Sequence, residues 1–227
     1  MREGPIVTLD GPAGSGKSST AIAVARRLGF RHLDSGALYR ALTLALLRSG
    51  KDPSAWSDLS ETELLGLEVD IEPAGDGFTV LVGGSPVQEE LRSAQVTRLV
   101  PEVARLPAVR GSLMALQRRA GAEGRLVADG RDMGTVVFSD AEVKVFVVAD
   151  VDERARRRLK ERGGSTHDSE EVARQADALG ARDKADSERE ISPLKRADDA
   201  HDLDTTSLSF DEQVEVVVDL VHRLTLP

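Results

Sequence analysis

The 227-residue sequence has no cysteine, one tryptophan and one tyrosine. Without cysteine, the chain has no disulfides, thiolate metal sites or cysteine nucleophiles. Aromatic residues make up 3% of the sequence, too few for a platform on which nucleic-acid bases stack. There is no apolar run long enough to span a bilayer, and the apolar run at 6–9 leaves no room for a signal peptide before it. We therefore expect a cytoplasmic protein with neither membrane nor nucleic-acid partners.

Charge is distributed unevenly along the chain. The formal net charge is −9, which argues against a protein that coats nucleic acid, because such a protein needs a basic face. Arginine is nevertheless concentrated at residues 105–131 and 154–162. Local arginine in an acidic chain suits a small, highly charged anionic ligand. For most single arginines, however, a solvated helix face is the simpler interpretation.

The most informative stretch is GPAGSGKSS, residues 11–19, which fits the phosphate-loop pattern G-x-x-x-x-G-K-[ST]. The apolar run at 6–9 predicts a buried strand before it. Helical spacing predicts a helix after it, with Ile22, Ala25 and Leu28 on the buried face. Glycines let backbone N–H groups turn toward a phosphate, and a helix N-terminus adds partial positive charge. The stretch therefore predicts a nucleoside triphosphate site.

We expect this loop to hold ATP and magnesium. Lys17 can reach the β- and γ-phosphates, and Ser18 can hold Mg²⁺. Asp129 follows another predicted strand and is either a group near the magnesium or a cap of its strand. The four histidines are scattered and form no metal-ligand set. The expected ATP contacts are Gly11, Pro12, Ala13, Gly14, Ser15, Gly16, Lys17, Ser18 and Ser19.

Strands and helices alternate along most of the chain. This alternation predicts an α/β fold with a doubly wound, parallel, five-stranded sheet of the P-loop NTPase type. A helix after Gly36 has its apolar stripe at Leu38, Leu42, Ala45 and Leu46. The same helix is expected to carry Tyr39 and Arg40 in its first turn.

The spacing of apolar residues changes in the middle of the chain. Short β-like pieces separated by glycines between Glu68 and Glu90 predict a small antiparallel sheet inserted between helices. The pattern at 93–121 is helical again, interrupted by Pro101 and Pro107. Two helices are therefore expected, the second starting near Pro107, since proline suits a first-turn position.

Four further motifs appear in order: DSGALYR (34–40), DGRDMGT (129–135), ERARRR (153–158), and RDKADSER with ISPL (182–194). With the phosphate loop, they closely resemble bacterial cytidylate kinases over nearly the whole chain, the β insert included. The phosphate loop alone is shared by many families, whereas DGRDMGT with RDxxDSxR is far more discriminating. The resemblance implies transfer of the ATP γ-phosphate to CMP or dCMP, in pyrimidine nucleotide metabolism.

The resemblance also implies roles for individual residues. It places Ser35, Tyr39, Arg40, Arg131 and Arg189 at the acceptor phosphate, Arg182 and Asp186 at the ribose, and Arg110 and Asp132 at the cytosine edge. It makes Arg154, Arg157, Arg158 and Arg162 a lid over the transferring phosphoryl group. Those four arginines, with Lys17 and Arg131, are the expected catalytic set.

We expect one monomeric domain over residues 1–227. Its core comprises 1–50 and 122–227, an acceptor-binding region with the β insert spans about 51–121, and the lid spans about 154–166. Many family members have a serine touching the cytosine amine where this chain has Pro101. Proline has no hydroxyl, so that contact is absent or supplied by a neighbour, and base selectivity is expected to be looser.

Two other functions stay open at this point. One is a P-loop kinase for another small acceptor, such as UMP, AMP or shikimate. The other is a regulatory nucleotide switch that signals through a partner and has no second substrate. A switch needs loops whose order changes with the γ-phosphate, and the arginine-rich motifs have no obvious role in that process.

Overall fold

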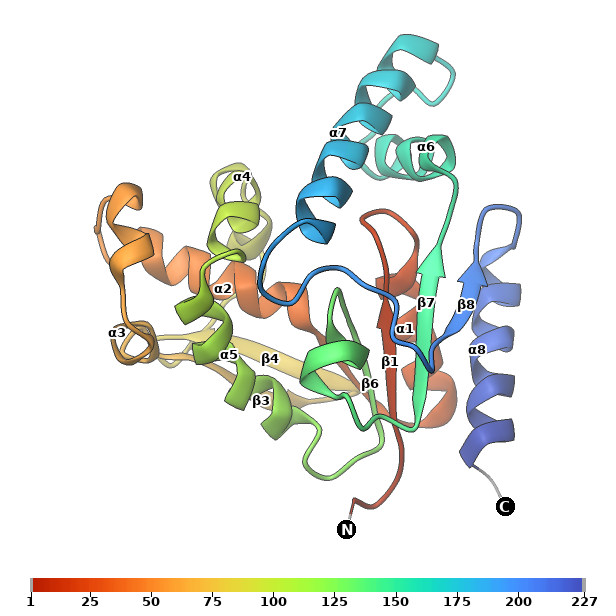
Figure 1. Cartoon of the computed structure of the whole chain (residues 1–227), viewed down its shortest axis with the longest axis horizontal. Helices are drawn as coiled ribbons and strands as arrows, with labels where there is room; N and C mark the ends of the chain where they lie inside the picture. The colour runs from red at the N-terminus through yellow and green to blue at the C-terminus, as the bar shows by residue number, and fades with distance from the viewer. Residues whose placement is uncertain (1, 226–227) are drawn as a thin grey trace.

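A computed structural model describes residues 2–225, and a five-stranded parallel sheet forms its centre (Figure 1). The strand order is β2-β6-β1-β7-β8, so β1, which precedes the phosphate loop, is the central strand. The strands are β1 (Ile6–Asp10), β2 (Arg31–Asp34), β6 (Leu126–Gly130), β7 (Val143–Val148) and β8 (His201–Asp204). This order confirms the predicted doubly wound sheet, in which ligands bind beyond the carboxyl ends of the strands.

Helices cover both faces of the sheet. On one face, α1 (Lys17–Leu28) packs with α8 (Phe210–Thr225), and on the other lie α2 (Ser35–Arg48) and α5 (Pro107–Ala120). Successive residues of β1 enter different cores: Ile6 packs in the α2 core and Val7 in the α1 core. Burial on both sides explains why these strands read as continuous apolar runs.

The segment between α2 and β6 forms a lobe beside the sheet (Figure 1). Its three-stranded antiparallel sheet, β3-β4-β5, confirms the predicted insert. Ile71, Val80 and Val82 of that sheet belong to the same apolar cluster as α2, so the insert packs on the main core. Its elements are η1 (Pro53–Asp58), α3 (Glu61–Leu65), β3 (Val69–Ala74), β4 (Gly77–Val82), β5 (Ser85–Pro86), η2 (Glu90–Arg92) and α4 (Ala94–Val103).

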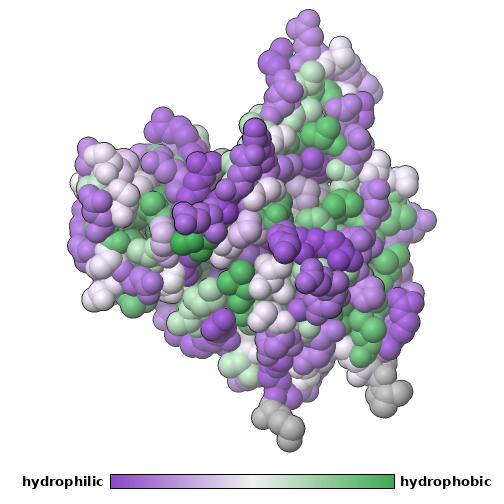
Figure 2. All heavy atoms as spheres, viewed as in Figure 1, coloured by the Kyte–Doolittle hydropathy of each residue, from purple (hydrophilic) through white to green (hydrophobic). Residues whose placement is uncertain are grey.

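Helices α6 (Val151–Glu161) and α7 (Ser169–Ser187) form a hairpin that projects beyond the carboxyl ends of the strands (Figure 1). A small apolar core joins Leu159 and Leu179 of this hairpin to Ala13 of the phosphate loop. Figure 2 shows the surface hollowed between the hairpin and the lobe that carries α4, with hydrophilic side chains on both sides. Between residues 2 and 225, none of the helices has the length and apolar composition needed to cross a bilayer.

Three local predictions are wrong. Ile22 is 36% exposed, and α1 buries Ala21 and Val24 beside the correctly predicted Ala25, because α8 packs against the face that begins one residue earlier. Tyr39 and Arg40 are not in the first turn of α2, since that helix begins at Ser35, where Asp34 caps it through the Ala37 N–H.

The third error concerns proline. Pro101 does not interrupt the helix at 93–103 but lies inside α4, which continues to Val103. Proline removes one backbone hydrogen bond, and here the remaining bonds carry the helix past it, as the Ala104 N–H still donates to Val100 O at 2.9 Å. The second helix does begin at Pro107, as predicted.

Candidate active site

The phosphate loop connects β1 to α1 through backbone angles that favour glycine. Gly11, Gly14 and Gly16 have φ values of 154°, 78° and 87°. A side chain at residue 11 would also collide with the Val147 carbonyl oxygen. The loop places Lys17 at the start of α1, buried, with its Nζ donating to Pro12 O at 3.0 Å. The loop and its helix N-terminus therefore have the form that suits a phosphate group.

Burial disfavours the charged form of the Lys17 side chain. Burial, with the charges of the nearby Arg131 and Arg182, lowers its pKa to about 7, and Asp129 and Asp10 limit the shift. A phosphate group beside Nζ would supply the negative charge that restores the ammonium. Lys17 is thus placed and tuned to meet an anion.

Next to Lys17, Ser18 and Asp129 form a hydrogen-bonded pair. Ser18 Oγ donates to Asp129 Oδ2 at 2.5 Å, and Asp129 Oδ1 lies 2.8 Å from His32 Nε2. Burial opposes ionisation of Asp129, but the bonds from His32 and Ser18 and the Lys17 charge hold its pKa below the ordinary value. Asp34 pairs with Asp129 in the β2–β6 register, and burial, with Asp129, raises its pKa.

This pair fits a magnesium ion bound chiefly by a nucleotide. No three His, Asp or Glu side chains among residues 2–225 are grouped to hold a metal by themselves. Mg²⁺ commonly keeps several waters and takes only one or two protein ligands in addition to substrate phosphates. The Ser18 hydroxyl and the Asp129 carboxylate supply that oxygen chemistry beside the loop.

Arginines of the DGRD and DSER motifs lie opposite the loop. Arg131 Nε donates to Asp186 Oδ2 at 3.0 Å, and Arg189 Nη1 lies 3.8 Å from Asp186 Oδ1. Burial, followed by the repulsion from Arg131, lowers the pKa of Arg182 to about 10. Nε of Arg182 and Nη2 of Arg189 are buried without a hydrogen-bond partner. These arginines therefore have unused N–H donors that can bind an anionic ligand.

Arg110 and Asp132 form a buried ion pair at the far end of this group. Arg110 also donates to Ala104 O at 3.0 Å and lies over the Tyr39 ring, 5.3 Å from its centroid. Burial raises the pKa of Tyr39 to about 12. The pair thus presents a donor and an acceptor together, since guanidinium only donates and carboxylate only accepts.

Two more residues of the predicted acceptor set lie on α2. Ser35 is buried at the start of the helix and faces Gly130, where an added Cβ would lie 2.5 Å from Ser35 Oγ. Arg40 donates to Leu91 O at 3.1 Å and Thr97 Oγ1 at 2.9 Å. Burial lowers the Arg40 pKa, Asp34 opposes this, and Arg158 adds to it, so α2 and the α6 hairpin bring cations toward each other.

The four predicted lid arginines do not lie together. Arg154 is buried, donates to Ala13 O at 3.1 Å and pairs with Asp183, which ties the hairpin to the phosphate loop. Arg158 pairs with Glu161 at 2.9 Å, and Arg162 is exposed at the end of α6.

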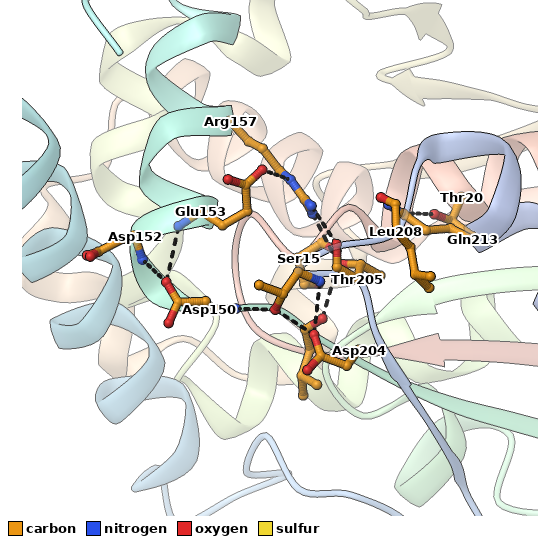
Figure 3. Close-up of polar contacts among 12 residues, drawn as sticks. Ser15, Thr20, Asp150, Asp152, Glu153, Arg157, Asp204, Thr205, Leu208 and Gln213 are labelled. Atoms are coloured by element: carbon orange, nitrogen blue, oxygen red, sulfur yellow. Dashed lines mark hydrogen bonds and ion pairs between the residues drawn. The ribbon is translucent and has the colours of Figure 1, made fainter. Parts of the chain in front are cut away.

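Arg157 instead reaches the segment after β8. It binds Glu153 at 2.9 Å, Thr205 Oγ1 at 3.0 Å and Thr205 O at 2.6 Å, while Thr205 Oγ1 donates to Ser15 O at 2.9 Å (Figure 3). Arg157 thereby connects α6 to the back of the phosphate loop.

Sequence reasoning missed several of these residues. Asp10, His32 and Thr205 contact the predicted site but belong to none of its recognised motifs, and Asp183 lies within RDKADSER but was given no role. Asp10 and Thr205 directly follow β-strand runs, at the edge where ligands bind. That position was a usable signal for Asp10 and Thr205.

Comparisons with known proteins agree with this geometry. The family model described as cytidylate kinase matches residues 7–223. A protein named cytidylate kinase from Salinibacter ruber is 47% identical, with 95% of this chain and 96% of that protein covered. One from an Exiguobacterium species is 42% identical, with 99% of each covered.

Other relatives are longer. A protein named bifunctional pantoate ligase/cytidylate kinase from a Synechococcus strain is 45% identical over 97% of this chain, which spans only 45% of that protein. A solved structure of an uncharacterized protein from Eubacterium ventriosum shares the fold, with a TM-score of 0.53, 12% identity, and 97% of this chain and 99% of that chain covered. The family match over nearly the whole sequence, together with these relatives, shows that the chain belongs to the cytidylate kinase family.

Proposed function

We propose that this protein transfers the γ-phosphate of ATP to CMP or dCMP, giving ADP and CDP or dCDP. The observation that carries the proposal is the half-buried group of Arg131, Arg182 and Arg189 opposite Lys17. Arg131 and Arg182 repel each other and Lys17, and phosphate groups of the two substrates would relieve this repulsion. Family membership and the names of the full-length relatives support the same reaction.

On the donor side, backbone N–H groups of the phosphate loop cradle the ATP phosphates, and Lys17 contacts the β- and γ-oxygens. Ser18, with Asp129 beside it, would hold Mg²⁺, which would neutralise charge on the same phosphates. Phosphoryl transfer requires mainly positioning and charge stabilisation, so no protein nucleophile is needed.

On the acceptor side, Ser35, Tyr39, Arg40, Arg131 and Arg189 bind the CMP phosphate, and Arg182 and Asp186 bind the ribose. Arg110 faces the ring acceptors O2 and N3 of cytosine, and Asp132 accepts from its N4 amine. When CMP binds, the Arg110–Asp132 ion pair opens only in part. Each of the two side chains gives up one contact with the other and gains one contact with the base.

The α6–α7 hairpin acts as the lid. Arg154 fixes its base on the phosphate loop, and Arg158 and Arg162 swing toward the transferring phosphoryl group when both substrates are bound. Closure expels water, which strengthens each arginine contact and suppresses hydrolysis of ATP.

The test is an ADP-release assay with Mg²⁺-ATP and each of CMP, dCMP, UMP, AMP and shikimate. We expect CMP or dCMP to give the highest kcat/KM. A higher value for another acceptor would make the protein a kinase for that acceptor. ATP loss at the same rate with no acceptor would favour a nucleotide switch. We also propose a monomer in the cytoplasm, which sedimentation equilibrium and cell fractionation test.

A further inference from the structure

Asp10 is a buried acid at the junction of the two halves of the site. It ends β1, directly before Gly11 of the phosphate loop, and it is 5% exposed. Its carboxylate accepts two backbone hydrogen bonds from a distant segment: Met133 N–H at 2.9 Å on Oδ1 and Gly134 N–H at 2.7 Å on Oδ2. Each oxygen therefore holds one amide of the loop that follows β6.

That loop carries the acceptor-binding side chains. Met133 and Gly134 open η3 (Met133–Val137), a single π-helical turn, directly after Arg131 and Asp132. The first N–H groups of a helical turn have no partner within it, and the Asp132 side chain forms no cap. Asp10 supplies those partners from another strand, and so fixes the backbone one residue away from Asp132.

The backbone around Asp10 and around the loop that it binds is closely packed. A Cβ at residue 134 would lie 2.8 Å from Thr8 Oγ1 on the same strand as Asp10. A Cβ at residue 11 would collide with Val147 O. The backbone on both sides of Asp10 is therefore held tightly, and a change in the Asp10 side chain is transmitted to the Arg131–Asp132 segment.

We propose that Asp10 is a positioning residue that holds Arg131 and Asp132 at a fixed distance from the phosphate loop. It touches neither substrate and acts through the amides of Met133 and Gly134. The inference rests on the proposed function only for the identity of the acceptor. Transfer requires the reacting atoms to lie within about 3.5 Å of each other, so a shift of this segment impairs acceptor use before it impairs ATP binding.

The charge of Asp10 supports this role. Burial, with the charge of Asp132, raises its pKa to about 6, and the two amides and Lys17 limit the shift. At neutral pH the carboxylate is ionised and can accept from both amides. An amide side chain offers one acceptor oxygen, and its NH₂ group would face the second N–H donor.

The test compares Asp10→Asn with Thr8→Val. Thr8 is fully buried on the same strand, its hydroxyl has no hydrogen-bond partner, and it contacts the same loop. For Asp10→Asn we expect the KM for CMP to rise roughly tenfold or more and the CMP-to-UMP ratio of kcat/KM to narrow. The Kd for ATP, measured by calorimetry without acceptor, stays within about twofold. Thr8→Val keeps all three values near wild type.

Hydrogen exchange gives a readout that does not depend on the reaction. Exchange in the peptide covering 131–137 should rise in Asp10→Asn and not in Thr8→Val, relative to the phosphate-loop peptide. If Asp10→Asn does not fold, the smaller Asp10→Ser takes its place.

Two results would overturn the proposal: a lower Tm with unchanged KM and base ratio, or an equal loss of ATP and CMP affinity. Failure of wild type to phosphorylate CMP would defeat the proposed function while leaving the exchange result to decide the role of Asp10.

Discussion

The phosphate loop takes its form from nine consecutive residues, whereas the arginines that face it come from α2, α5, the β6–η3 loop and the end of α7. The donor half is thus encoded locally, by glycine angles and a helix N-terminus. The acceptor half exists only after the sheet and the lobe have packed. A change in the loop should therefore abolish phosphoryl transfer directly, whereas a change in the arginine group should act by altering the position of the acceptor and the selectivity for its base.

The largest effect is expected at Lys17. Lys17→Ala should leave the fold intact and lower kcat by more than a hundredfold, since a pre-placed charge on the transferring phosphate contributes about 3 kcal/mol or more in the transition state. Circular dichroism checks the fold, and the ADP-release assay gives kcat. A folded variant with turnover near wild type would remove Lys17 from the donor site.

Arg158→Ala should come next. We expect kcat to fall roughly tenfold or more with a smaller change in the KM for CMP, because its contact forms mainly with the transferring phosphoryl group. Arg156→Ala is the matched control, as Arg156 is exposed on the same helix. A weaker CMP affinity with unchanged kcat would instead place Arg158 in the acceptor site.

Asp132→Asn tests the acceptor half through base choice. A carboxylate accepts from the cytosine amine but faces a carbonyl oxygen in uracil, whereas an amide can donate or accept. The ratio of kcat/KM for CMP over UMP should therefore narrow by about tenfold. The buried Arg110 keeps a neutral partner in this variant, so folding should survive. An unchanged ratio would leave Asp132 as a residue that only orients its neighbours.

The smallest expected effect is the uptake of protons when ATP binds. Since burial depresses the Lys17 pKa to about 7, below its unfolded value, the side chain is about nine-tenths neutral at pH 8. Because folding lowers this pKa, the free energy of unfolding is highest above the unfolded pKa and decreases as pH falls toward 7. ATP binding should raise the pKa and take up close to one proton at pH 8. Calorimetry in two buffers of different ionisation enthalpy measures this uptake.

Lys17→Arg is the control for that measurement, because arginine stays charged and should bind ATP without proton uptake. If wild type and Lys17→Arg take up equal numbers of protons, the uptake comes from another group and the depressed pKa of Lys17 is not supported.

The same contrast explains what the sequence could predict. The strands, the phosphate loop and the β insert were predictable because each is a local pattern of apolar runs and glycines. The buried face of α1 was not predictable, because it depends on packing against α8, almost 200 residues later in the sequence. That packing leaves Ala21 buried and Ile22 exposed.

The hydrogen-bond partners of Asp10 and His32 could not be predicted either. Their partners, Met133 and Asp129, are more than ninety residues away and meet them only through the parallel register of β1, β2 and β6. The division of the lid arginines, with Arg154 and Arg157 held at the loop, depends on Asp183 and Thr205. None of those contacts has a signature in the spacing of ERARRR.

The central claim is that the two halves form one site that transfers a phosphoryl group between nucleotides and excludes water. Phosphorus NMR of a mixture of Mg²⁺-ATP, CMP and enzyme tests it directly, since ADP, CDP and inorganic phosphate have separate signals. We predict that CDP and ADP appear in equal amounts, with no inorganic phosphate above the enzyme-free control. Release of inorganic phosphate without CDP would contradict the account.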